Sequence, residues 1–210
     1  MIRELPGQAE LNPLEVNSKI FQVIREASAV TASDPVTAIA AASMGEAMVP
    51  LDRDNQITGN SILGFDTRGI PYLEPVRKKI PDERFYFLTG QPPGPGYSLT
   101  AFRYLVEKKT SEYAKTACYL PWADYVTFLL TGEKYVTESF AARTLLYDRL
   151  KHGWSEEIAD AAAFRVAKLP AVIPSGKVCG RILPETARDL GLSPHAVVVS
   201  GIHDQCAATL

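Results

Sequence analysis

Apolar residues recur along the chain at two different spacings, which predict alternating helices and strands. A helix is expected from residue 12, where an Asn cap and a Pro precede apolar residues three to four apart, namely Asn12, Pro13, Val16, Ile20, Ile24 and Ala27. The segments 35–44 and 196–200 are continuous runs of small and β-branched residues. Such runs predict buried strands, the second one buried on both faces.

The remaining segments continue this alternation. Residues 46–51 predict a strand that ends in a turn at 52–55, and 169–182 predicts a strand or extended loop. Caps and prolines predict helices at 121–133 and 183–192, a helix begun by Ser155, and one begun by Ser98 after the Gly/Pro loop 90–96. The predicted fold class is therefore α/β, with nothing that marks a domain boundary within residues 1–210.

Composition and charge restrict the class of protein to which the chain can belong. The chain of 210 residues is 46% hydrophobic and 22% charged, which is ordinary for a globular protein. A net charge of −2 gives no reason to expect nucleic acid or an anionic membrane as a partner. No apolar run approaches the roughly 20 residues of a membrane span, and the start is not a signal peptide. Three cysteines without C-x-x-C spacing predict buried free thiols, and we expect a cytoplasmic protein.

The candidate chemistry begins where the last predicted strand ends, at His203, Asp204, Gln205 and Cys206. Strand ends that lead into helices are where open α/β sheets place ligand sites. Asp204 could be the cap of the next helix, which is the simpler interpretation of this stretch alone, or a general base for a substrate hydroxyl. His203 and Cys206 lack a second ligand pair, so no metal site is predicted.

Glu46 offers a second carboxylate at a strand end, either in a turn or as a ligand for a substrate hydroxyl. For Asp66 and Arg68 we favour a structural ion pair. The chain contains no G-x-x-x-x-G-K-[ST] and no G-x-G-x-x-G. Its GQPPGPG loop has three prolines that lack N–H groups, so it is a poor phosphate cradle.

Several stretches in order resemble the amino-terminal domain of the FGGY carbohydrate kinases, which include xylulose, glycerol and polyol kinases. They are IAAASMGEAMVPLD (39–52), SILGFDTRG (61–69), PGYSLTAFRYL (95–105), DYVTFLLTGEKYVTESFAARTLLYDRLKHGWS (124–155), SGKVCGRI (175–182) and VVVSGIHDQCAATL (197–210). The resemblance spans nearly the whole chain. It implies a ribonuclease H-like fold, as in actin, hexokinase and the Hsp70 ATPase, and a kinase that uses ATP and Mg²⁺.

The resemblance also implies roles for particular residues. Asp204 matches the catalytic aspartate that takes the proton of the attacking hydroxyl, and Gln205 would bind sugar hydroxyls. Glu46 falls where glycerol kinases have a carboxylate and xylulose kinases a histidine. Gly45 stands where glycerol kinases have an arginine, so a side-chain contact is expected to be lost. Tyr97 lies in a loop similar to one that closes over the substrate, and His203 is expected in a loop near the sugar.

Two departures from the family pattern change the expectation. Gly64 replaces the usual Trp of W-x-D-x-R, which could open space near the site. The opening strands with their D-x-G-T-[ST] phosphate loop and the whole second domain have no counterpart in residues 1–210. We therefore expect an inactive part of a kinase for a small-molecule sugar or polyol, with exposed strand edges that favour a homo-oligomer.

Two other hypotheses remain open at this point. The chain could be a non-catalytic sugar-binding or scaffolding module derived from such a kinase. It could also be an unrelated α/β hydrolase or metal enzyme that uses His203, Asp204 and Cys206, although it has no G-x-S-x-G elbow. The candidate contacts Glu46, Gln205 and Gly64 leave ketopentoses, polyols and deoxysugars open as substrates.

Overall fold

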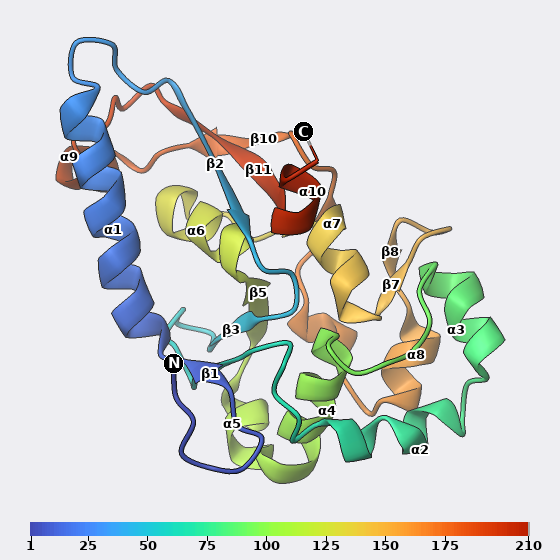
Figure 1. The fold of residues 1–210 in the computed structure, drawn as a ribbon. Coiled ribbons are helices and arrows are strands. Elements are labelled where there is room, and N and C mark those ends of the chain that lie inside the picture. The colour runs from blue at the N-terminus through green and yellow to red at the C-terminus, as the bar shows by residue number, and fades with distance from the viewer. Residues whose placement is uncertain (210) are drawn as a thin grey trace.

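A computed structural model describes residues 1–209 as helices arranged around several small sheets (Figure 1). The helices are α1 (Pro13–Val30), α2 (Glu74–Arg77), α3 (Asp82–Thr89), α4 (Ser98–Lys108), α5 (Thr110–Lys115), α6 (Trp122–Thr131), α7 (Glu138–Ala141), α8 (Glu156–Ala161), α9 (Pro184–Leu190) and α10 (Asp204–Ala207). The 3₁₀ turns are η1 (Ile70–Tyr72), η2 (Ala142–Thr144) and η3 (Val166–Lys168). The strands are β1 (Glu10–Leu11), β2 (Ala38–Ser43), β3 (Met48–Leu51), β4 (Ser61–Ile62), β5 (Cys118–Pro121), β6 (Val136–Thr137), β7 (Tyr147–Asp148), β8 (Gly153–Trp154), β9 (Val172–Ile173), β10 (Val178–Arg181) and β11 (Val197–His203).

The largest sheet brings together segments from both ends of the sequence. Its order is β10-β11-β2, with β11 antiparallel to β10 and parallel to β2. The register places His203 opposite Ser43, so the carboxyl ends of β11 and β2 meet. Gly201 permits a close approach within this pair, because a Cβ at that position would lie 1.7 Å from the carbonyl oxygen of Ala41. The α/β class is therefore correct.

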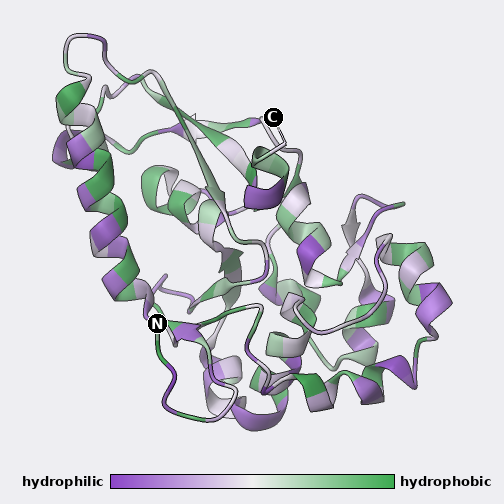
Figure 2. Ribbon diagram, viewed as in Figure 1, coloured by the Kyte–Doolittle hydropathy of each residue, from purple (hydrophilic) through white to green (hydrophobic). Residues whose placement is uncertain are grey.

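The burial predicted for these two strands is wrong. Along β2, exposed and half-buried residues alternate, and along β11 only one face is fully buried. β2 is the last strand of its sheet, so one of its edges has no strand partner within residues 1–209. Apolar residues of α1 and α6 face it across an open groove, including Ile20, Ile24 and Val126. Hydrophobic and hydrophilic residues alternate along α1, as expected for a helix with one apolar face (Figure 2).

The predicted helix ends are mostly confirmed. The Asn12 side chain accepts a hydrogen bond from the Leu14 N–H, and Ser155 accepts one from the Ile158 N–H. Helices α6 and α9 end at glycines with positive φ, as predicted. Ser98 does not cap α4. It is the first helical residue, and its hydroxyl donates to the Glu46 carbonyl oxygen at 2.8 Å, which fixes the strand end that carries Glu46.

The cysteines differ from the prediction of buried thiols. Only Cys118 is buried, and burial raises the pKa of its thiol to about 11. Cys179 is half-buried, and Cys206 is exposed because the short helix α10 turns that residue to solvent. Within residues 1–209, no helix is both long and apolar enough to cross a membrane.

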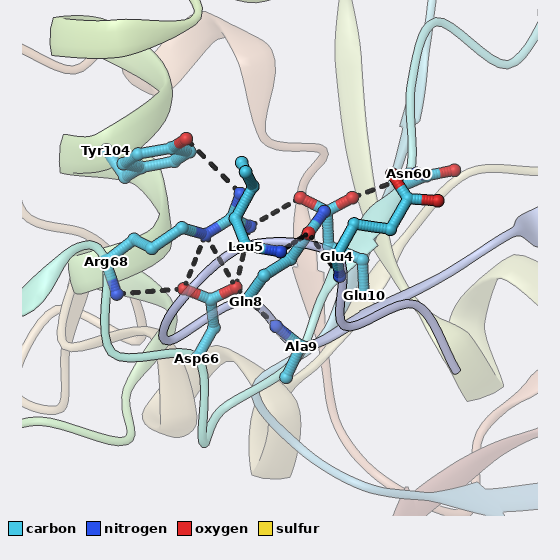
Figure 3. Close-up of polar contacts among 9 residues, drawn as sticks. All are labelled: Glu4, Leu5, Gln8, Ala9, Glu10, Asn60, Asp66, Arg68 and Tyr104. Carbon is cyan, nitrogen blue, oxygen red and sulfur yellow. Dashed lines mark hydrogen bonds and ion pairs between the residues drawn. The ribbon is translucent and has the colours of Figure 1, made fainter.

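Asp66 and Arg68 form a buried structural network, as the favoured interpretation held (Figure 3). One Arg68 amino group lies 2.5 Å from Glu10 Oε1 and 2.7 Å from Asp66 Oδ2, and the guanidinium stacks on the Tyr104 ring. Asp66 also accepts the Ala9 N–H at 2.8 Å. Burial raises the pKa of Glu10, but the hydrogen bonds from Arg68 and Asn60 outweigh it and lower the pKa overall. The network ties the amino-terminal segment to the segment after β4.

Candidate functional site

Two strand ends place the candidate residues at one edge of the main sheet. β2 leads through Met44 and Gly45 to Glu46, and β11 leads through His203 to Asp204. Because β2 and β11 are parallel neighbours in register at Ser43 and His203, their carboxyl ends meet. The structure therefore brings together two segments that lie more than 150 residues apart in the sequence.

Glu46 is paired with a residue that the sequence analysis did not single out. Arg143 donates from Nε to Glu46 Oε1 at 2.5 Å, and its Nη2 lies 2.5 Å from the same oxygen. The two side chains are 15% and 28% exposed, so the pair is shielded but open to a ligand. Both donors reach Oε1, and Oε2 has no hydrogen-bond partner among residues 1–209.

The Tyr97 ring stacks on the guanidinium of Arg143. Its guanidinium carbon lies 4.5 Å from the centroid of the Tyr97 ring, a cation–π contact. The Tyr97 hydroxyl donates to Gln91 Oε1 at 2.6 Å, and Arg143 Nη1 donates to the same oxygen at 3.2 Å. Tyr97 and Gln91 both come from the segment between α3 and α4. This segment thus contacts Arg143, and the closure of the Tyr97 loop over a substrate stays a prediction.

Gly45 lies between Arg143 and His203. A Cβ at Gly45 would lie 2.7 Å from Arg143 Cγ and 2.7 Å from His203 Cδ2, closer than side chains tolerate. The lost contact at Gly45 stays a prediction, and the guanidinium of Arg143 reaches this strand end from elsewhere in the chain. Gly64 also lies against the pair, since its Cβ would lie 3.0 Å from Glu46 Cβ and 3.3 Å from Oε2.

Asp204 begins α10 instead of capping it. His203 occupies the cap position without a side-chain hydrogen bond to the helix, and it is the last residue of β11 instead of a loop residue. Asp204 Oδ1 accepts the Gln205 N–H at 2.7 Å and lies 3.2 Å from His203 Nε2. Oδ2 has no partner among residues 1–209, and the side chain is 48% exposed.

His203 itself is held firmly. Its backbone N–H donates to Ser139 Oγ at 3.1 Å, and its ring packs edge-on against Phe140. The imidazole is 10% exposed, and it contacts both the Asp204 carboxylate and the Phe140 ring. Gln205, predicted to bind hydroxyls, is exposed, and only its backbone takes part in a hydrogen bond at this edge.

The loop 90–96 offers few backbone N–H groups to a phosphate. The loop 90–96 contains Pro92, Pro93 and Pro95, and its Gln91 side chain is already engaged by Tyr97 and Arg143. Within residues 1–209, no group of three or more His, Cys, Asp or Glu side chains is arranged to hold a metal ion.

Comparison with known proteins identifies the family. The sequence profile of the FGGY family of carbohydrate kinases, N-terminal domain, matches residues 1–210. The chain belongs to this family. It is 27% identical over 209 residues to the L-xylulose/3-keto-L-gulonate kinase of Escherichia coli strain K12 and 28% identical over 213 residues to the xylulose kinase of Bacillus subtilis strain 168. These alignments cover 98% and 100% of the chain and 42% of each relative, so the chain spans less than half of their length.

Solved structures agree on the fold. The xylulose kinase from Rhodospirillum rubrum superposes with a TM-score of 0.90 at 22% identity, covering 100% of this chain and 43% of that one. A ligand-bound xylulose kinase from Lactobacillus acidophilus gives a TM-score of 0.89 at 23% identity, covering 100% and 42%. The chain therefore has the fold of the amino-terminal part of these FGGY kinases, and the predicted family and fold are confirmed.

Proposed function

We propose that the chain supplies the sugar- or polyol-binding part of an ATP-dependent carbohydrate kinase, with Asp204 as the general base. The observation that carries this proposal is the arrangement of Asp204. Its Oδ1 is held by the Gln205 N–H and lies beside His203, while Oδ2 is left without a protein partner at the sheet edge shared with Glu46. A carboxylate held by one oxygen can accept a proton at the other.

The other residues of this edge act on the acceptor molecule. Glu46 and Arg143 bind and orient its hydroxyls, Gln205 adds a further polar contact, and the Tyr97 ring stacks on the Arg143 guanidinium. The phosphate donor, ATP with Mg²⁺, requires groups other than those described here. We therefore propose that residues 1–210 alone do not transfer phosphate, and that the working kinase is a cytoplasmic homo-oligomer.

A specific observation favours a second candidate function. Glu46 and Arg143 make a polar, partly shielded site, which a non-catalytic sugar-binding module would also need. The two candidates make opposite predictions for phosphate transfer.

Asp204→Asn tests the base in the kinase that contains this chain. A general base contributes about 10²–10⁴-fold to the rate, so kcat should fall by that factor while sugar binding persists. Asp160→Asn is the matched control, because Asp160 is an exposed carboxylate on α8, away from the site. Unchanged kcat in the Asp204 variant would refute the base assignment. Sugar binding with no phosphate transfer by the unmodified protein would favour the binding module.

A further inference from the structure

The imidazole of His203 is packed against helix α7, next to the Asp204 carboxylate. Its ring meets Phe140 edge-on, with ring centroids 6.3 Å apart and an angle of 80° between the two planes. Phe140 is fully buried, and the backbone N–H of His203 donates to Ser139 Oγ on the same helix at 3.1 Å. The ring is therefore held against the interior, while its Nε2 lies 3.2 Å from Asp204 Oδ1.

Helix α7 is itself anchored to the core at its first turn. Thr137, the residue before the helix, donates from its N–H to Asp124 Oδ2 at 2.8 Å and from its hydroxyl to Oδ1 at 2.5 Å. Both side chains are buried, and a fully paired buried network of this kind rigidifies its surroundings. Ser139 and Phe140 therefore present a fixed surface to His203.

Gly45 leaves the space that the imidazole occupies. A Cβ at this position would lie 2.7 Å from His203 Cδ2 and 3.0 Å from His203 Nε2. Any larger residue at the end of β2 would displace the ring, because packed side chains do not approach so closely. The end of β2 and helix α7 thus both determine where Nε2 lies.

We propose that His203 is a positioning residue for Asp204, with its Nε2–H donating to Oδ1 so that Oδ2 faces the acceptor hydroxyl. The inference rests on the proposed function, because it assigns a partner to the base proposed there. The ring donates from Nε2 when its proton is on that nitrogen. The Nε2–Oδ1 separation of 3.2 Å is at the long end of the hydrogen-bond range, and such contacts in active sites tighten when the substrate binds.

A second donor is needed because one hydrogen bond leaves a carboxylate free to turn. The Asp204 side chain is 48% exposed, and the Gln205 N–H fixes Oδ1 alone. A donor from β11 on the same oxygen restricts rotation of the carboxylate and keeps Oδ2 available. In the transfer the acceptor O–H bond breaks, the proton goes to Oδ2 and the electron pair stays on the acceptor oxygen. His203 keeps its own proton throughout.

Three substitutions of His203 separate the hydrogen bond from ring packing. His203→Phe keeps an aromatic ring against Phe140 and has no donor. His203→Gln loses the ring, but its amide nitrogen is as many bonds from Cα as Nε2 is. His203→Asn has an amide nitrogen one bond nearer to Cα, at the place of Nδ1.

The variants are compared in the kinase that contains this chain. The acceptor is the one phosphorylated fastest in a panel of pentuloses, hexuloses and polyols that includes D-xylulose, L-xylulose and glycerol. Displacing a reacting group by about 1 Å can cost roughly 10²-fold in rate, so kcat should fall about tenfold in His203→Phe and His203→Asn. KM should stay near its original value, and His203→Gln should recover most of kcat. A packing role predicts the reverse order, with His203→Phe active and His203→Gln impaired.

A double variant tests whether His203 acts through Asp204. When Asp204→Asn has already removed the base, adding His203→Phe should lower kcat little further, because the two residues act as a unit. His195→Phe is the matched control, since His195 is exposed and lies ahead of β11, at the other end of that strand. Circular dichroism reports folding, and if His203→Phe is unfolded, the Gln and Asn variants decide the outcome.

The possible results distinguish this inference from the proposed function. Unchanged kcat in His203→Phe, or equal losses in His203→Gln and His203→Asn, overturns the positioning role, while a slow Asp204→Asn leaves the base in place. Unchanged kcat in Asp204→Asn overturns the base assignment and the positioning role with it. An unmodified kinase that phosphorylates no member of the panel overturns the proposed function.

Discussion

Replacing Arg68 with Met should strongly destabilise the folded chain. The guanidinium is 9% exposed and is the cation for two carboxylates, Glu10 and Asp66, whose side chains are 9% and 2% exposed. The substitution leaves two buried negative charges without a counterion. Removing one partner of a buried pair costs about 3–5 kcal/mol, so the free energy of unfolding should fall by that amount. In a thermal melt, at roughly 2–4 °C per kcal/mol for a chain of this size, the melting temperature should fall by about 6–20 °C.

Urea unfolding at pH 7, followed by far-UV circular dichroism, measures this loss. The slope of the free energy of unfolding against urea should match that of the unmodified chain, so that the midpoint reports stability. Because the pKa of Glu10 is lowered in the folded state, its contribution is present above its ordinary pKa and is lost as pH falls. The difference between Arg68→Met and the unmodified chain should therefore shrink below about pH 4.

Arg84→Met is the matched control. Arg84 forms a salt bridge with Glu157 at 2.5 Å and contacts the Phe87 ring, but both charged side chains are 44% exposed. Water replaces the lost partner there, so the midpoint should stay close to that of the unmodified chain. If Arg68→Met unfolds at the same urea concentration as the control, the argument that burial makes this network indispensable is wrong.

Two further predictions concern titration and association. Burial raises the pKa of Asp124 to about 6 although Thr137 donates two hydrogen bonds to it, so the folded state holds a proton that the unfolded state releases. Stability should therefore fall as pH rises from about 4 to 6, by about 3 kcal/mol, and Asp124→Asn should abolish this dependence in urea unfolding; an identical pH profile in the variant refutes it. The unpaired edge of β2 and the apolar groove beside it should make the isolated chain self-associate, and size-exclusion chromatography with a purely monomeric peak at high concentration contradicts this expectation.

Local signals were sufficient to predict most element ends. The helix ends depend on interactions within one helical turn, so the spacing of residues in the sequence is enough to predict them. The examples are the caps at Asn12 and Ser155 and the glycines that end α6 and α9. Ser98 was predicted as a cap for the same reason, but its hydroxyl found a tertiary partner in the Glu46 carbonyl. Tertiary contacts outweigh local preference where a hydroxyl is buried at the first turn.

Burial of the strands could not be predicted in this way. The small and β-branched residues of β2 have the composition of a buried strand, but burial depends on what lies next to them in space. In the described chain β2 is the last strand of its sheet and one edge is unpaired. The residue types show which strands could be buried, and the neighbouring elements determine which strands are buried.

In the candidate site, too, residues marked by their local sequence could be predicted, and a residue brought in by the fold could not. Glu46 and Asp204 could each be recognised because a carboxylate at the end of an apolar strand is conspicuous, and parallel pairing of β2 with β11 then joins the two ends. Arg143 gave no such signal: it lies 97 residues from Glu46, in a 3₁₀ turn among buried neighbours. Gly45 was the indirect clue. A Cβ at Gly45, directly before Glu46, would lie 2.7 Å from Arg143 Cγ and 2.7 Å from His203 Cδ2, so these two side chains occupy the space beside the strand end. A missing side chain at a strand end is therefore a reason to look for a long residue arriving from elsewhere in the fold.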